Sequence, residues 1–205
     1  MNDNIGKVLN NIELYHDIIE CLVGALEAKD LYTKGHSIRV ADISYQLAKK
    51  MGIKGKELEI IHMSAHLHDI GKIGIPDEIL HKEGKLTDKE FQSIKKHPEI
   101  GSNILKCSEK LKVLSELVLY HHERWDGKGY PNGLKGEEIP LGSRIIAVAD
   151  SIDAMTSERP YRKAMSWEIC KVEIENNKGK QFDPSIVEVT KDLWEGWKEK
   201  FGNKS

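Results

Sequence analysis

Apolar residues recur along most of this chain at intervals of three and four positions, the spacing of one face of an α-helix. Ile5, Val8, Leu9 and Ile12 begin the pattern near the N-terminus. The pattern predicts helices over the first thirty residues and over residues 38–48, 58–67, 111–118 and 145–155. No alternating apolar and polar stretch is long enough to predict a strand, so we expect helices to make up the regular structure.

Two local signals mark where further helices begin. Thr87 followed three residues later by Glu90 is a capping box, in which the two side chains bond backbone N–H groups that would otherwise be unpaired. The helix that begins there is interrupted or kinked at Pro98, because proline lacks the N–H that a helix interior needs. Asp183 is an N-cap followed by proline at the first helical position, and it predicts a last helix over residues 184–197.

Short connections between these segments predict an all-α fold, a single-domain bundle of about seven helices. We expect residues 1–14 to form a helical lead-in that packs loosely or dimerises, and residues 15–205 to form the domain. One connection is long and rich in glycine and proline: RWDGKGYPNGLKGEEIPLG, residues 124–142. Loops longer than about 12 residues inside a compact domain are usually functional or disordered. Because this loop carries two aromatic residues and an isoleucine that can anchor it, we expect it to be ordered and functional.

The charge balance excludes one class of partner. With 31 Lys and Arg against 33 Asp and Glu in 205 residues, the chain lacks the positive field that holds duplex nucleic acid. The three cysteines, Cys21, Cys107 and Cys170, stand alone without CxxC spacing, and we expect buried free thiols. The polar N-terminus and the lack of an apolar run near about 20 residues predict a cytoplasmic protein with no membrane span.

The segment AHLHDIGKIGIP, residues 65–76, places imidazoles, a carboxylate and an ammonium group where a helix ends. Burying an unpaired polar group costs roughly 2–7 kcal/mol, so something must compensate. His68 lies about 200° from His66 around a helix, so the pair His62/His66 and the pair His68/Asp69 cannot face one centre. We favour the second pair as metal ligands, because both can turn toward one ion at the helix end and an aspartate can bridge two ions. His62 and His66 are then structural.

A second histidine cluster lies at another helix end, and an acidic pair lies on one face of a predicted helix. Adjacent residues point about 100° apart on a helix, so His121 and His122 share a centre only near a helix end or in a two-metal site. A solvated helix end is the alternative for these two histidines. Asp150 and Asp153 are spaced i, i+3 on one face after an apolar run, where an aspartate is costly unless it is bound.

Together these motifs resemble the HD-GYP family, a branch of the HD metal-dependent phosphohydrolases. The resemblance covers about residues 15–190. It is carried by YTKGHSIRVA, HLHDIGKIGIPDEIL, KKHPEIG, the long segment from HHERWDGKGYP to SERPYR, and KGKQFDP. Separate motifs in the family's order and at its separations make the resemblance specific.

The resemblance implies a binuclear metal centre. The residues that match the family's metal ligands are His36, His68, Asp69 and Asp150 for one ion and His97, His121 and His122 for the other. Asp69 would bridge the two ions. Some members bind a third ion through a glutamate four residues before the first histidine; Tyr32 stands there in this chain, so we expect two ions. Iron is frequent in the family, with manganese or another transition metal as the alternative, and imidazole and carboxylate ligands suit all of them.

The resemblance also implies the residues that meet the substrate. The matching positions are Lys72, Tyr130, Asp153, Arg159 and Arg162. Lys72 and the bridging Asp69 are expected to act in catalysis, with Lys72 or a water on the metal protonating the leaving group. The alternative for Tyr130 is a side chain that plugs the bundle.

The family's characteristic activity is hydrolysis of cyclic di-GMP to linear pGpG or onward to GMP, through hydroxide formed at two metal ions. Some members prefer 3′,3′-cyclic GMP-AMP, which is the first alternative. A catalytically weak module that senses the nucleotide or docks a partner is another, and an HD-type phosphohydrolase of mononucleotides is a third, against which the GYP loop argues. The resemblance implies a diguanylate cyclase or response regulator as protein partner, and we expect a monomer or weak homodimer.

Overall fold

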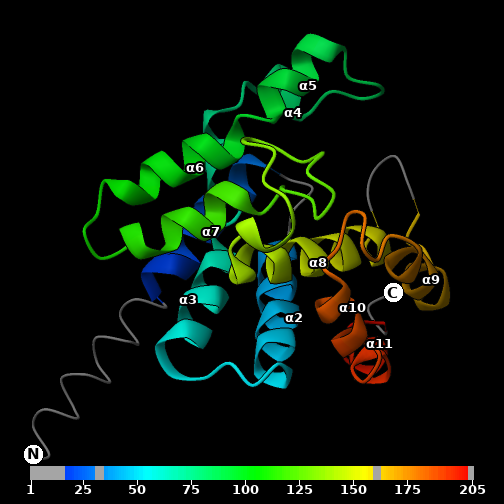
Figure 1. Cartoon of the computed structure of the whole chain (residues 1–205). Helices are drawn as coiled ribbons and strands as arrows, with labels where there is room; N and C mark the ends of the chain where they lie inside the picture. Colours follow the sequence, from blue (N-terminus) through cyan, green and yellow to red (C-terminus); the bar gives the residue numbers. More distant parts are fainter. Residues whose placement is uncertain (1–16, 31–34, 159–162, 203–205) are drawn as a thin grey trace, which may run out of the picture.

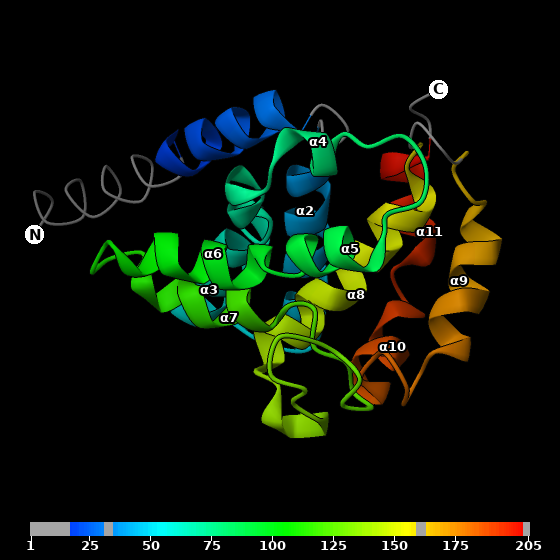
Figure 2. The same cartoon turned by 90° about the horizontal axis from the view of Figure 1, so that it is seen from above.

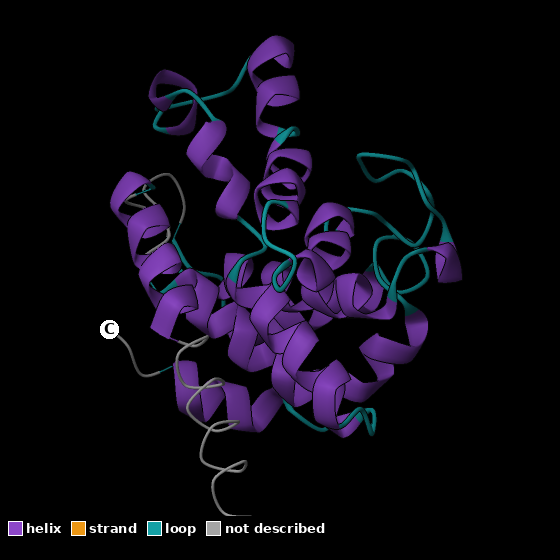
Figure 3. Cartoon of the chain, turned by 90° about the vertical axis from the view of Figure 1, so that its left-hand side faces the viewer, coloured by secondary structure: helices purple, strands orange, loops and turns teal. Residues whose placement is uncertain are grey.

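The computed structural model of the chain describes residues 17–30, 35–158 and 163–202. In these ranges helices and loops make up the chain, no strand is present, and an isolated bridge joins Lys178 to Phe182 (Figure 3). A helical segment at residues 17–29 comes first. The α-helices that follow are α2 (His36–Lys50), α3 (Gly55–His66), α4 (Asp77–Leu80), α5 (Asp88–Ile94), α6 (His97–Lys106), α7 (Ser115–Tyr120), α8 (Leu141–Thr156), α9 (Trp167–Asn176), α10 (Pro184–Thr190) and α11 (Trp194–Phe201). Short 3-10 helices are η1 (Ile70–Gly74), η2 (Lys112–Leu114) and η3 (Gly136–Glu138).

The all-α prediction is confirmed, and the locally encoded helix starts lie where the sequence predicts them. Thr87 Oγ1 accepts from the Glu90 N–H, and the Glu90 carboxylate accepts from the Thr87 N–H. Pro98 lies in the first turn of α6, so the predicted interruption is a break between α5 and α6. The Asp183 carboxylate accepts from the N–H of Ser185 at the start of α10.

The described residues contain four more α-helices than the seven predicted. Helix α4 was not predicted, and the helix predicted from Thr87 is divided into α5 and α6. The last helix predicted over residues 184–197 is wrong as one element, because α10 ends at Thr190 and α11 begins at Trp194. Helix α9 was not predicted, although Ser166 caps it by accepting from the Ile169 N–H, which is an ordinary helix-start signal.

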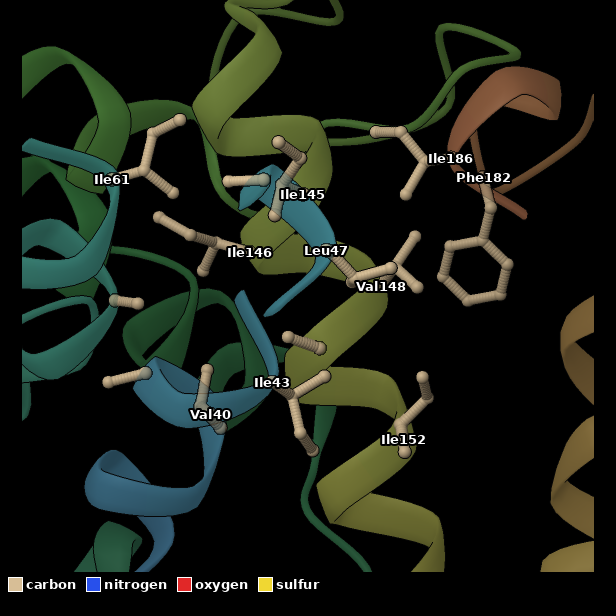
Figure 4. Close-up of a cluster of buried hydrophobic side chains, with 14 of the residues drawn as sticks. Val40, Ile43, Leu47, Ile61, Ile145, Ile146, Val148, Ile152, Phe182 and Ile186 are labelled. Atoms are coloured by element: carbon tan, nitrogen blue, oxygen red, sulfur yellow. The ribbon is translucent and has the colours of Figure 1, made fainter. Parts of the chain in front are cut away.

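Helices α2 and α8 pack against each other at the centre of the fold (Figures 1 and 4). Their contact buries Val40, Ile43 and Leu47 of α2 and Ile146 and Ile152 of α8. Helices α9, α10 and α11 cover one side of this pair, and α3, α6 and α7 lie on the other side (Figures 1 and 2). Residues of the last third of the chain therefore complete the hydrophobic core around α2 and α8.

A second, smaller core lies on the side of α6 and α7. It consists of Ile19, Val23, Leu67, Leu105, Leu114 and Val118. The residues with candidate chemistry follow directly on the two cores: His68 comes after Leu67, and Asp150 comes after the buried Ala149. Packing of the apolar neighbours thus determines where His68 and Asp150 lie in the fold.

The segment between α7 and α8, residues 121–140, is irregular apart from η3. Its backbone is tied to the segment before α10: the Trp125 N–H donates to the Gln181 carbonyl at 3.1 Å, and the Asp126 N–H donates to the Lys180 carbonyl at 2.7 Å. Ile139 is buried near its end. These contacts anchor the glycine-rich stretch at both of its sides.

The structure bears differently on the predictions made for the cysteines, for membrane-spanning helices and for the N-terminal lead-in. Cys170 is buried, but Cys21 and Cys107 are exposed, so the expectation of buried thiols is wrong for two of three. A lone cysteine carries no periodic signal, and which helix face packs is settled by its neighbours. None of the helices in the described ranges combines the length and apolarity needed to cross a membrane. The lead-in predicted over residues 1–14 lies outside the described residues.

Candidate metal centre

The His68–Asp69 pair lies at the point where α3 gives way to η1, and both side chains are buried. Gly71 allows η1 to pack directly on α6: a Cβ at this position would lie 1.8 Å from the His97 carbonyl oxygen and 2.5 Å from the Gly101 nitrogen. Only glycine permits this approach. It brings Asp69 next to His97, although the two are far apart in sequence.

The first group of candidate ligands gathers around His36, the first residue of α2. His36 Nε2 lies 3.3 Å from His68 Nε2, 3.4 Å from Asp150 Oδ1 and 3.7 Å from Asp69 Oδ2. His68 Nε2 is 3.3 Å from the same Asp69 oxygen. The ligand atoms of His36, His68 and Asp69 all lie within 4.8 Å of one another, and Asp150 adjoins this group at His36.

The second group consists of His97, His121 and His122. His97 Nε2 lies 3.3 Å from His121 Nε2, and the ring centroids of His121 and His122 are 4.1 Å apart. Both residues of the adjacent pair follow the last residue of α7, where the helix ends and two neighbouring side chains can converge. The solvated helix end considered as an alternative does not describe His121, which is fully buried.

Asp69 lies between the two groups. Its Oδ1 is 3.3 Å from His97 Nε2, and its Oδ2 is 3.3 Å from His68 Nε2. Each oxygen of one carboxylate thus faces a different group. This is the arrangement that a carboxylate needs to bridge two ions.

Hydrogen bonds determine which nitrogen each imidazole offers. The Nδ1 atoms of His68, His97 and His121 lie 2.8, 2.8 and 2.6 Å from the carbonyl oxygens of the residues three positions earlier. A carbonyl oxygen only accepts, so each Nδ1 carries the proton and donates, and Nε2 keeps its lone pair. His36 Nδ1 donates in the same way to Asp153 Oδ2 at 2.7 Å. All four Nε2 atoms therefore point into the centre, as metal-ligating histidines do.

The protonation of these histidines fits a cation at the centre. Burial lowers the pKa of His97, and burial together with neighbouring imidazoles lowers the pKa of His121 well below its usual value and that of His122 to about 3. Neutral imidazoles whose Nε2 lone pairs face each other at 3.3 Å cannot hydrogen-bond to one another, but they can share a metal ion. The donor set of imidazole and carboxylate without thiolate suits a divalent transition metal.

His36 differs from the other histidines. Burial alone would lower its pKa, but the hydrogen bonds to Asp153 and Asp69 and the charge of Asp150 raise the pKa to about 9. Without an ion, this histidine balances the surrounding carboxylates as an imidazolium. A divalent cation would replace that proton, because a ligating imidazole must be neutral.

Asp153 lies one turn beyond Asp150 on α8 and faces the other side of the His36 ring. Its two oxygens accept from His36 Nδ1 and from the Arg39 guanidinium, and the side chain is 3% exposed. This geometry favours a role in orienting His36 over the predicted contact with substrate. Arg39 was missed from the sequence, because a charged residue on a helix gives no local sign of a partner 114 positions away.

Lys72 extends from η1 to the edge of the first group. Its Nζ lies 2.8 Å from Asp69 Oδ2 and 3.2 Å from Oδ2 of the buried Asp30. Burial alone would lower the pKa of Lys72, but the two carboxylates raise it above the usual lysine value, so the side chain stays charged. Asp30 was also missed from the sequence, where it is one acidic residue at the end of an amphipathic helix.

Tyr130 brings the long loop to the second group. Its ring lies 4.9 Å from the His122 ring, at 30° to it, and the Lys95 ammonium lies 5.1 Å from its centroid. The buried Glu123 holds this part of the loop, because its Oε1 accepts from the N–H groups of Asn132 at 2.7 Å and Gly133 at 3.0 Å. The predicted substrate residues Arg159 and Arg162 lie outside the described residues.

The i, i+4 pair His62/His66 does not join the candidate metal centre. The rings of His62 and His66 are 4.8 Å apart, and the Tyr45 ring packs on His62 at 5.3 Å. Among the residues that the structure describes, the groups with metal-ligating geometry are those built on His97 and on His36. The pair His68/Asp69 is thus the one that the fold brings to the other candidate ligands.

This all-helical bundle gathers histidines and aspartates from four helix ends and from the interior of α8 into two adjoining clusters, and so belongs to the class of helical domains built around a metal centre. The model of the family described as "HD domain" matches residues 20–186 of this chain, and the chain belongs to that family. The HD-GYP branch expected from the motifs agrees with the relatives found.

Curated relatives and a solved structure support the assignment. The chain is 47% identical over 175 residues to a cyclic di-GMP phosphodiesterase of Thermotoga maritima, covering 84% of this chain and 48% of that protein. It is 39% identical over 201 residues to 3′3′-cGAMP-specific phosphodiesterase 2 of Vibrio cholerae, covering 94% of this chain and 38% of that protein. The chain thus spans less than half the length of these two relatives. A crystal structure of a cyclic GMP-AMP-specific phosphodiesterase of V. cholerae has the same fold, with a TM-score of 0.69 and 21% identity over 91% of this chain and 51% of that one.

Proposed function

We propose that this domain is a metal-dependent phosphodiesterase that hydrolyses cyclic di-GMP to linear pGpG or onward to GMP. The observation that carries the proposal is the double cluster of imidazoles and carboxylates, with one oxygen of Asp69 facing each half. The activities named for the relatives support the substrate class. Hydrolysis of 3′,3′-cyclic GMP-AMP is the second candidate, because a relative 39% identical to this chain is specific for it.

The proposed metal ligands divide into two sets around Asp69. They are His36, His68, Asp69 and Asp150 for one ion, and Asp69, His97, His121 and His122 for the other. Iron is the first expectation and manganese the second, since both accept imidazole and carboxylate ligands. A pair of bound divalent ions supplies Lewis-acid polarisation of the phosphoryl group and an activated water.

Lys72 is proposed to act on the phosphoryl group. As a charged ammonium beside Asp69, it can neutralise the negative charge that grows on the phosphoryl oxygens, and it can donate a proton to the departing 3′ oxygen. Asp30 keeps the ammonium in place from the other side. Cleavage on this side of the phosphate leaves the phosphate on the 5′ carbon.

Two side chains are proposed to position other groups. Asp153 holds the His36 ring through Nδ1, which fixes the tautomer and aims Nε2. Burial raises the pKa of Tyr130, so its phenol stays protonated and can donate to the nucleotide at the edge of the centre. Substrate contacts by Arg159 and Arg162 remain predictions, and so do a diguanylate cyclase or response regulator as partner.

The test is turnover by protein purified without oxygen. Metal content is measured first, and cyclic di-GMP and 3′,3′-cyclic GMP-AMP are then offered with Fe(II) or Mn(II). We expect about two ions per chain and a linear dinucleotide product, and Asp69→Ala should lose both the ions and the activity. If the wild type linearises neither nucleotide with either metal, the enzyme proposal is wrong.

The same experiment separates the enzyme from a sensing module. A sensor would bind cyclic di-GMP in equilibrium dialysis but leave it intact. Linear product that accumulates with time and requires Asp69 excludes that alternative.

A further inference from the structure

A cavity of about 260 Å³ extends from the candidate metal centre under the long loop. His122, Tyr130 and Asp150 line it, and so do Arg124, Ser151 and Gln181, which belong to neither ligand group. This space is sufficient for one fused ring system of a nucleotide. The extra lining residues are therefore candidates for contacts to one base.

Arg124, Gln181 and Ser151 form one wall of this cavity, and hydrogen bonds connect Asp126 to Arg124 and Arg124 to Gln181. Asp126 accepts from Nε and Nη2 of Arg124 at 3.0 and 2.9 Å, which locks the guanidinium in its plane. Arg124 Nη1 then donates to Gln181 Oε1 at 3.0 Å. The two backbone hydrogen bonds from residues 125 and 126 to residues 181 and 180 hold the same two segments together. The Arg124 and Gln181 side chains of this wall are therefore held in a fixed orientation before any ligand binds.

This linkage determines which end of the Gln181 amide is turned away from Arg124. An arginine can only donate, so the atom facing Nη1 must be the amide oxygen. The amide NH₂ is then directed to the other side, where it lies 3.5 Å from Ser151 Oγ, at the outer limit of a hydrogen bond. A serine hydroxyl can donate or accept, because its hydrogen rotates and its oxygen keeps lone pairs. The wall therefore offers one fixed donor, the Gln181 NH₂, beside the adaptable hydroxyl of Ser151.

A fixed donor opposite the C6 group of a purine distinguishes guanine from adenine, while the adaptable Ser151 hydroxyl can meet N7 of either base. Guanine presents two neighbouring acceptors, N7 and O6, whereas adenine presents the acceptor N7 next to the donor amino group at C6. An amide NH₂ facing the adenine amino group leaves two donors opposed and unpaired, which a buried site tolerates poorly.

From this geometry we propose that Gln181, oriented by Arg124 and joined by Ser151, forms a guanine-selective subsite beside the metal centre. The inference rests on the proposed function, because it concerns which base of a cyclic dinucleotide is read there. One guanine satisfies the subsite, so cyclic di-GMP and 3′,3′-cyclic GMP-AMP are both accepted, and cyclic di-AMP is rejected.

The test compares kcat/KM for cyclic di-GMP and cyclic di-AMP in the metal-loaded protein. Gln181→Met removes the donor at nearly constant length, and Gln181→Glu keeps the bond to Arg124 but places an acceptor where the NH₂ was. We expect each variant to lower the ratio of the two kcat/KM values by about five- to 150-fold, the usual range for one well-placed base contact. Gln92→Glu, an equal charge change at an exposed position of α5, should leave the ratio unaltered.

Three outcomes overturn the subsite. Equal loss of activity on both substrates would make Gln181 a merely structural residue. An unaltered ratio in both variants would mean that this wall does not meet the base. A gain in preference for cyclic di-GMP by Gln181→Glu would show that the opposite, donor edge of guanine faces residue 181. If instead the wild type cleaves no cyclic dinucleotide, the proposed function fails first and the subsite fails with it.

Discussion

Single hydrogen bonds decide what each imidazole of this centre can do. A histidine whose Nδ1 donates to a backbone carbonyl or carboxylate has one nitrogen left for a ligand, and it is Nε2. His68, His97 and His121 obtain that bond from their own helix turn, three residues back. His36 obtains it from Asp153 on another helix, so its orientation depends on tertiary packing.

The dependence of His36 on Asp153 predicts a loss of metal affinity in Asp153→Ala. The substitution removes the acceptor of the Nδ1 proton and leaves the Arg39 guanidinium without that carboxylate. We expect affinity for Mn(II) to fall about 10- to 100-fold, as is typical when a partner of a ligating histidine is lost. Titration with Mn(II) followed by calorimetry measures it, with Asp88→Ala, at an exposed position, as control. Unchanged affinity would contradict the role given to Asp153.

Substitution of Lys72 should separate catalysis from metal binding. Lys72→Met removes the charge next to Asp69 but no candidate ligand. We expect kcat to fall about 10²- to 10³-fold, as for the loss of one preorganised electrostatic group, while two ions per chain are retained. Activity assays and metal analysis measure the two properties on the same samples.

The matched control for Lys72→Met is Lys85→Met, an exposed lysine that should leave both properties intact. Loss of the ions together with activity would instead make Lys72 a structural partner of Asp69.

At the scale of secondary-structure elements, the sequence predicts what lies within one turn of the chain. The capping box at Thr87 and the N-cap at Asp183 need contacts only between residues two or three positions apart, so they can be read directly. The break between α10 and α11 cannot, because the apolar spacing continues through residues 191–193 while the backbone turns. Whether such a continuous apolar stretch forms one helix or two is settled by the core against which it packs.

The long loop is the element whose position most affects the centre, and Glu123 holds it. Glu123→Ala removes the acceptor of two backbone N–H groups. Since hydrogen bonds to charged groups contribute about 1.5–3 kcal/mol, we expect the free energy of unfolding to fall by that amount. Urea denaturation measures it, and limited proteolysis should cut the loop faster.

Glu137→Ala is the control for the loop, because Glu137 is an exposed residue of the same segment. Equal stability of the two variants would show that the Glu123 carboxylate does not hold the loop.

At the scale of the whole molecule, the buried imidazoles couple stability to pH. His97, His121 and His122 have lowered pKa values, chiefly through burial, and regain about 6.5 when the chain unfolds. Below pH 6.5 the unfolded chain therefore binds more protons than the folded chain. The free energy of unfolding of metal-free protein should rise from pH 5 to pH 7, by up to about 1.4 kcal/mol per pH unit for each histidine.

His36 acts in the opposite direction at higher pH. Its pKa of about 9 in the fold means that it contributes stability below about pH 6.5, and this contribution is lost as pH rises toward 9. We expect EDTA-treated protein to be most stable near neutral pH in urea denaturation at pH 5, 7 and 9. Stability that does not change between pH 5 and 7 would contradict the neutral state of the three lowered histidines.

The sequence by itself determined the helical class, the helix starts marked by Thr87 and Asp183, and the identity of the histidines and aspartates that the structure gathers. Periodicity and capping are local, and the motif resemblance names residues without needing to place them. Helix geometry showed that His68/Asp69 and His62/His66 cannot face one centre, and the position of His68/Asp69 at a helix end, with a carboxylate that can bridge two ions, decided the choice.

Only the tertiary structure decided which groups surround those residues. The sequence assigns no role to Asp30, Arg39, Glu123 or Gln181. Each acquires one through a partner or cavity wall that folding brings to it. The close approach of Gly71 to His97 likewise places one carboxylate between two histidine groups. Such contacts join distant parts of the chain, and their energies depend on burial and direction, which no local pattern of residues records.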